Sequence, residues 1–164
     1  MGHAERSRQS GLPQWIWWAA YSVIAFWAQD MSGGLDFLSP AVLICLQTGQ
    51  WWAATIFTAS WILVQEGVGN LMFGSSIVFF AGMHVLFFLA RWLLEPENPL
   101  FIIFFSLLLA VWSRLVLVGV VAFQEVHVQL DDPWTVIGRQ WLAYGIYWSV
   151  MLMLYRRWNF HGRV

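Results

Sequence analysis

The chain has 164 residues, of which 60% are hydrophobic and 10% are charged. So few charged residues cannot cover a water-soluble domain of this size, and that class of protein is excluded. The net charge is −1 and lysine is absent, so a basic nucleic-acid-binding surface and a polybasic lipid-binding tail are excluded as well. The composition predicts an integral membrane protein whose surroundings are the lipid bilayer.

The long apolar runs favour helices over barrel strands, because they continue for about twenty residues without alternation. The first run follows a basic start and could belong to a cleaved signal peptide, but its tryptophan-rich entrance and the lack of a small-x-small site favour a retained helix. The second run is short and begins near Pro40, so it could tilt, thin the bilayer or enter only partly. We predict an all-α integral membrane fold in which residues 1–164 form a single membrane domain. Its six spans are predicted at about 13–29, 37–49, 51–67, 72–94, 98–123 and 135–158.

The arginines at the ends of the predicted spans indicate an orientation. With six spans, the arginines before the first, after the fourth and after the last fall on one side, which predicts that both termini are cytoplasmic. Most of the thirteen tryptophans then fall near the two membrane interfaces, as an aromatic belt would. The cytoplasmic group comprises Trp15, Trp17, Trp18, Trp51, Trp52, Trp92 and Trp158, and the outer group Trp27 and Trp134.

The outer turn between the third and fourth spans contains the sequence Glu66-Gly67-Val68-Gly69-Asn70. Glycine tolerates positive φ in a tight turn, and a carboxylate there can reach water, so a plain hairpin would explain the stretch. Further small residues, among them Gly74 and Gly82, could let helices approach closely.

Arg114 is the one charge that the sequence places well inside a span. A buried cation costs about 2.5–3.5 kcal/mol on insertion scales and therefore needs a partner. Glu66 and Arg114 each lie about 22 Å along their helices at 1.5 Å per residue, so we expect them to form an ion pair between the outer turn and the fifth span. The alternative is that Arg114 snorkels alone to the outer head groups.

The residue types that usually carry catalysis are scarce and scattered. His84 is the only histidine in a predicted span, so it suits a hydrogen-bonded core role better than haem ligation, which usually needs a second axial ligand. Cys45 stands alone, and we find no metal-binding spacing, phosphate loop or activated serine. We therefore expect no enzyme activity, no metal and no cofactor.

The order of features resembles the rod shape-determining protein MreD family over most of the chain. The resemblance rests on a short basic start, the Pro-initiated stretch SPAVLICL, the stretch QEGVGNLMFG, a basic end to the fourth span and the final WLAYGIYWSVMLMLYRRW. In the third stretch Glu66 takes the family's acidic position and Gly74 its closing glycine.

The resemblance implies a non-enzymatic inner-membrane component of the bacterial cell-wall elongation complex, which takes part in cell shape. Its expected partners are an MreC-like bitopic protein and, through the complex, the cell-wall synthases. The resemblance also implies a fold similar to the substrate-binding subunits of energy-coupling-factor vitamin transporters. We expect substitutions to be least tolerated at Glu66, Gly67, Gly74, Arg114 and Asp131.

Two alternatives remain open at this point. A vitamin-binding transporter subunit would show an outward-open cavity with convergent polar groups, whereas a scaffold would have a mostly packed interior. A quinone-linked haem subunit would need a second buried histidine.

Overall fold

The computed structural model describes residues 14–32, 35–68, 74–125 and 132–161, and within these ranges every regular element is a helix. The predicted all-α fold is thus confirmed. The helices are α1 (Gln14–Met31), α2 (Ser39–Gln47), α3 (Trp51–Val68), α4 (Ser75–Leu93), α5 (Pro99–Phe123) and α6 (Pro133–His161).

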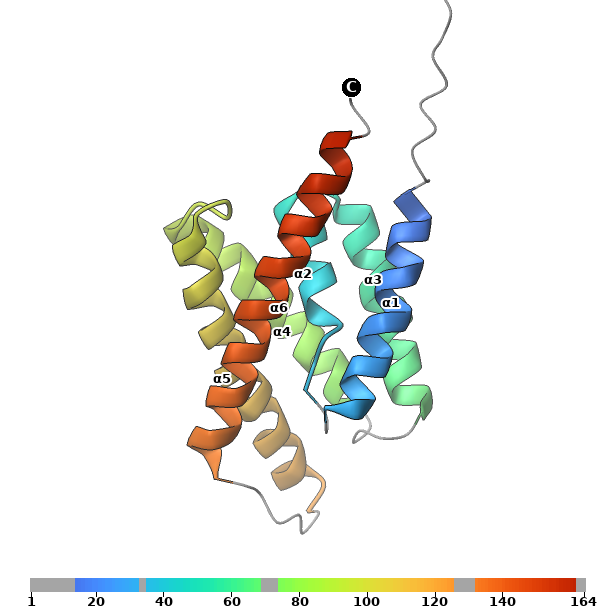
Figure 1. The fold of residues 1–164 in the computed structure, drawn as a ribbon. Coiled ribbons are helices and arrows are strands. Elements are labelled where there is room, and N and C mark those ends of the chain that lie inside the picture. Colours follow the sequence, from blue (N-terminus) through green and yellow to red (C-terminus); the bar gives the residue numbers. More distant parts are fainter. Residues whose placement is uncertain (1–13, 33–34, 69–73, 126–131, 162–164) are drawn as a thin grey trace, which may run out of the picture.

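The helices surround α2 and begin and end at two opposite ends of the bundle (Figure 1). The first residue of α1 and the last of α6 lie at the same end, which we call the chain-end side. The end of α3, the start of α4, the end of α5 and the start of α6 lie at the other end, which we call the turn side. Helix α5 packs against α4 and α6, and α2 packs against α3 and α6. In the described residues, only α4 and α5 combine the length and hydropathy expected of a membrane-crossing helix.

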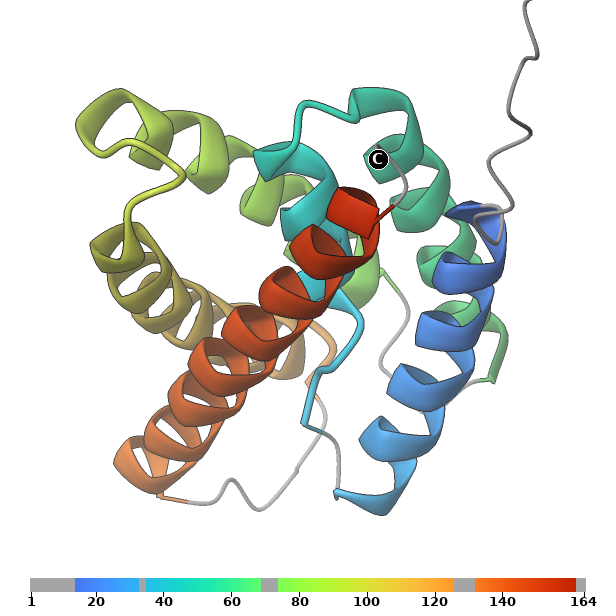
Figure 2. The same cartoon turned by 45° about the horizontal axis from the view of Figure 1, so that its top comes forward.

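Helix α2 is too short to cross a bilayer. Its nine residues span about 14 Å, roughly half of a 30 Å hydrocarbon core. Its first eight residues are all buried, and Figure 2 shows it enclosed by its neighbours.

A tight turn joins α2 to α3. Gly49 has φ +74°, and its N–H donates to Leu46 O over 3.3 Å, while Gln50 N–H donates to Cys45 O over 2.8 Å. This pair of hydrogen bonds is a Schellman motif, which needs the left-handed conformation that glycine adopts without strain.

Aromatic side chains fill the core. Phe101 and Phe105 of α5 stack with ring centroids 5.4 Å apart, and the indole of Trp148 on α6 meets both rings edge-on at 6.1 and 5.9 Å. Such pairs contribute about 0.5–1.5 kcal/mol each beyond the area that they bury. They fix the contact between the two longest helices.

The tryptophan belt needs one correction. Trp18 is only 6% exposed and packs against Phe57 and Tyr155, with ring centroids 5.0 and 5.5 Å away. It links α1 to α3 and α6 as a core residue and does not belong to an interface belt. Trp92 is 95% exposed, as a belt residue would be.

Helices α4 and α5 approach closely at Gly82. The indole of Trp112 lies over this glycine, and a Cβ added there would come within 2.6 Å of Trp112 Nε1. The same Nε1 donates to Phe79 O over 3.1 Å. Gly82 therefore permits a close helix approach, as its small size suggested.

Candidate functional site

Three helices, α2, α4 and α6, begin at the turn side, and a carboxylate accepts hydrogen bonds at the start of each. Asp36 Oδ1 accepts hydrogen bonds from Leu38 N and Ser39 N, at 2.8 and 3.1 Å. Its Oδ2 accepts from the Ser39 hydroxyl and, over 2.9 Å, from the Tyr144 hydroxyl. The negative charge thus sits at the positive end of the α2 dipole and ties α2 to α6.

Glu66 plays the equivalent part at α4. Its Oε2 accepts from Gly74 N over 2.9 Å and its Oε1 from Ser76 N over 3.2 Å. Gly74 is the N-cap of α4 and has φ +83°, a conformation that favours glycine. Glu66 lies in the last turn of α3, which continues to Val68, so it fastens the end of α3 to the start of α4.

The expected ion pair between Glu66 and Arg114 stays a prediction. Both carboxylate oxygens of Glu66 accept hydrogen bonds from backbone amides at the start of α4. The charge of Arg114 also acts on Asp132, just before α6, and contributes to a lowered pKa of that carboxyl. The larger cause of this lowered pKa is hydrogen bonding from Thr135, whose N and Oγ both reach Asp132 Oδ2.

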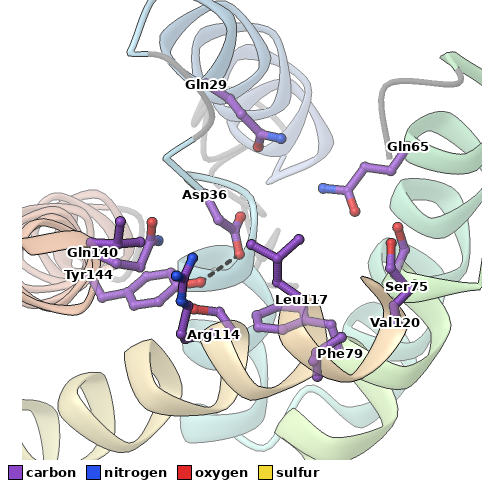
Figure 3. A pocket seen from close by; sticks show the side chains of 14 residues that line it. Gln29, Asp36, Gln65, Ser75, Phe79, Arg114, Leu117, Val120, Gln140 and Tyr144 are labelled. Atoms are coloured by element: carbon purple, nitrogen blue, oxygen red, sulfur yellow. Dashed lines mark hydrogen bonds between the residues drawn. The ribbon is translucent and has the colours of Figure 1, made fainter. Parts of the chain in front are cut away.

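A cavity of about 220 Å³ lies between the ends of these helices on the turn side. Figure 3 shows side chains converging on it from α1, the segment before α2, α3, α4, α5 and α6. Its apolar lining includes Phe79, Leu117 and Val120. The polar lining comprises Gln29, Asp36, Gln65, Ser75, Ser76, Ser113, Arg114, Gln140 and Tyr144.

Several polar atoms on this wall are buried without a hydrogen-bond partner. They include Gln29 Oε1, Ser75 Oγ, Ser76 Oγ and Gln140 Nε2. Ser76 and Gln140 are only 3% and 7% exposed. Each such group costs about 1–3 kcal/mol when nothing satisfies it, and groups of this kind around a hollow are usually satisfied by water or a ligand.

The residues expected to be least tolerant of change fall into three groups. A hydrogen bond brings Glu66 and Gly74 together. Arg114 lines the cavity, as does Ser76, whose N–H also donates to Glu66. Gly67 lies inside α3, and a Cβ there would contact nothing within 4 Å, so the structure gives no steric reason for a glycine. Asp131 lies outside the described residues.

Sequence reasoning missed Asp36, Gln140 and Tyr144 as site residues. The signal for Asp36 was available, because an acidic residue followed three positions later by Ser39-Pro40 is typical of a helix start. Gln140 and Tyr144 are spaced i, i+4 on one helix face, but that spacing alone does not show which cavity they face.

The remaining chemistry-bearing residues stand apart. His84 Nδ1 lies 2.8 Å from Phe80 O one turn earlier in α4, so the predicted hydrogen bond is present, but His84 is only half-buried and does not belong to the core. Cys45 is buried. Across the described ranges, no three His, Cys, Asp or Glu residues gather closely enough to hold a metal ion.

The chain matches no protein-family model, no curated protein and no solved structure.

Proposed function

We propose that the chain is a non-enzymatic, multi-pass component of the bacterial inner membrane that acts in cell-wall elongation by associating with an MreC-like bitopic partner. In this proposal all six helices lie in the membrane region, both termini are cytoplasmic, and the cell-wall synthases are reached through the complex. The MreD resemblance supplies the biological setting.

An apolar exterior supports the membrane location. Large apolar side chains are exposed on five helices, for example Ile24 on α1, Leu63 on α3, Val85 on α4, Leu115 on α5 and Ile146 on α6. Water-soluble monomers rarely expose apolar patches larger than a few hundred Å². Lipid chains or partner helices would cover these side chains.

A groove between α4 and α5 carries the proposal of association. It has a volume of about 830 Å³. Residues between Leu86 and Leu94, in α4 and just after it, form one wall, and residues between Phe101 and Val111 of α5 form the other. All of its lining residues are Leu, Ala, Phe or Val. Such a surface suits the apolar side chains of a single membrane-spanning helix, which bind by packing in lipid.

The hydrogen bond between Glu66 and Gly74 supports the resemblance on which the biological setting depends. These two residues occupy the acidic and closing-glycine positions of the matching stretch, and one binds the backbone of the other over 2.9 Å. The acidic residue and the closing glycine of this stretch therefore form a hydrogen bond that joins the end of α3 to the start of α4.

Co-purification from the native membrane tests the proposal. Tagged protein should recover a bitopic MreC-like protein together with cell-wall synthases, as identified by mass spectrometry. Leu108→Trp, which fills the groove, should reduce that recovery at least tenfold. Leu115→Trp is the matched control, because Leu115 is also exposed on α5 but does not line the groove. Equal recovery with both variants would remove the groove from the proposal, and absence of the partner from every sample would refute it.

The polar cavity favours a second candidate function. Convergent polar groups under the turn side are what a substrate-binding subunit of an energy-coupling-factor vitamin transporter would present. Recovery of ATPase subunits in the same co-purification would support this candidate over the scaffold.

A further inference from the structure

The turn-side cavity holds the largest group of unpartnered polar atoms in the described chain. Ser76 and Gln140 are both more than nine-tenths buried. Both residues line the cavity, and their Oγ and Nε2 atoms are buried without a hydrogen-bond partner, as are Gln29 Oε1 and Ser75 Oγ of the same wall. Four such atoms around one hollow would lower stability if nothing occupied it. Their grouping points to an occupant with polar atoms of its own.

Most of the unpartnered groups on the wall can donate a hydrogen bond. The hydroxyls of Ser75 and Ser76 and the amide of Gln140 can donate, and Arg114 adds a planar cationic group with several N–H donors, whereas Gln29 Oε1 only accepts. An oxyanion accepts hydrogen bonds in several directions at once and pairs well with guanidinium. Its chemistry therefore fits this wall better than that of a cation.

The carboxylate of Asp36 also lines the cavity, but its charge is strongly compensated. It accepts hydrogen bonds from two backbone amides, the Ser39 hydroxyl and the Tyr144 hydroxyl. The two amides belong to the start of α2, where the helix dipole is positive. Asp36 therefore opposes an anion less than a carboxylate without donors would.

The rest of the lining is apolar and the volume is small. Phe79, Leu117 and Val120 cover one part of the wall, which suits a short hydrocarbon segment next to the polar group. A volume of about 220 Å³ lies below the roughly 300–1,000 Å³ of sites that enclose drug-sized ligands. The cavity can hold a head group and its first carbons, with any longer chain leaving between the helices.

We propose that this cavity binds an oxyanion group, a phosphate or a carboxylate, either as the head group of an amphiphile or as a free anion. The Ser75 and Ser76 hydroxyls, the Gln140 amide and the Arg114 guanidinium contact the oxyanion, while the apolar wall contacts the adjoining carbons. This binding goes beyond the proposed association with a partner protein and does not rest on it.

Direct titration of the purified full-length chain tests the proposal. Delipidated protein in a neutral detergent is titrated with dodecyl phosphate, dodecanoate, dodecanol and dodecyltrimethylammonium, and bound molecules are counted by native mass spectrometry. The phosphate and the carboxylate should each bind once per chain and at least tenfold more tightly than the alcohol or the cation. Equal binding of all four, or a preference for the cation, would overturn the proposal.

Inorganic phosphate distinguishes the two sources of the oxyanion. If millimolar inorganic phosphate displaces dodecyl phosphate, the site recognises a free anion. If it does not, the apolar segment is needed and the natural ligand is an amphiphile. Either result supports an oxyanion site, provided that dodecyl phosphate binds once.

Two variants separate a binding role from a structural one. Ser76→Ala and Gln140→Leu each remove an unpartnered buried polar atom, so the fold should not lose thermal stability, while dodecyl phosphate should bind roughly tenfold more weakly because one hydrogen bond to a charged group is lost. Arg114→Gln should weaken binding further. Ser149→Ala, whose hydroxyl is satisfied by Gly145 O at 2.7 Å, is the control and should bind normally. Unchanged binding by Ser76→Ala and Gln140→Leu would overturn the proposal.

Discussion

Substitution of Gly82 by alanine should destabilise the contact between α4 and α5. The new Cβ would lie within 2.6 Å of Trp112 Nε1, whereas ordinary contacts between such atoms begin near 3.4 Å. The indole must therefore move by about 1 Å or more, and its 3.1 Å hydrogen bond to Phe79 O would be stretched or lost.

The expected cost follows from three terms. Overpacking typically costs about 1–3 kcal/mol, and the lost hydrogen bond about 0.5–1.5 kcal/mol. Alanine in a helix interior returns roughly 0.5–1 kcal/mol relative to glycine. We therefore expect Gly82→Ala to lower the free energy of unfolding by about 0.5–4 kcal/mol, with a central value of about 2 kcal/mol.

The single cysteine provides the assay. Cys45 is buried in α2, so a thiol-specific fluorophore labels it only when the bundle opens, and labelling against denaturant concentration reports unfolding. Gly119→Ala on α5 is the control, because a Cβ there contacts nothing within 4 Å; this variant should be as stable as the parent chain or slightly more stable.

A double-mutant cycle with Trp112→Leu should recover most of the loss, since the clash is with the indole. The reasoning is refuted if Gly82→Ala and Gly119→Ala unfold at the same denaturant concentration, or if Trp112→Leu does not reduce the penalty.

Three further predictions concern the helix starts. Glu66→Gln leaves one carbonyl oxygen to accept from two backbone amides, so it should lower the free energy of unfolding by about 1–2 kcal/mol, as measured by Cys45 labelling. Gly67→Ala is the neighbouring control. If both variants were equally stable, Glu66 would not act as the cap of α4. Asp36→Asn removes the negative charge of the group that accepts hydrogen bonds from the start of α2 and from Tyr144. It should lower the free energy of unfolding by about 2–3 kcal/mol. Asp30 is exposed, and Asp30→Asn should leave the free energy of unfolding almost unchanged in the same denaturant titration. Hydrogen bonds from Thr135 lower the pKa of Asp132 below its ordinary value of 3.8, so this cap stabilises the fold above about pH 3.8 and loses its effect as the pH falls through the lower, folded-state pKa. Thr135→Val should weaken the pH dependence of the melting temperature, measured in thermal melts between pH 5 and pH 2. If the melting temperature varied with pH as it does in the parent chain, the Asp132 cap would not be the source of that dependence.

The sequence was sufficient for features that depend on local chemistry. Long apolar runs located the helices to within several residues, and the small size of Gly82 suggested a close approach. Each of these depends on hydropathy or side-chain size over a few residues, which the chain carries without reference to its neighbours.

Features that depend on a partner from elsewhere in the chain were harder to predict. Matching depths suggested that Glu66 would meet Arg114, but depth is one coordinate of three, and it did not reveal that the backbone amides of Gly74 and Ser76 bind the Glu66 carboxylate. Trp18 was expected at an interface because hydropathy does not tell which face of α1 meets Phe57. The cavity itself arises only where several helices converge, so no local pattern could reveal it.

The short central helix has a consequence for how the protein is made. When the nascent chain has reached Gln50, it contains α2, an apolar segment too short to span a bilayer alone. Helix α3, which follows the Gly49 turn, has not yet been synthesised. Helix α3 supplies the first neighbour, and α6, which also packs against α2, is synthesised after α3, α4 and α5. The packing around α2 is therefore completed only by α6, and a chain cut before Pro133 would leave the α6-facing side chains of α2 uncovered.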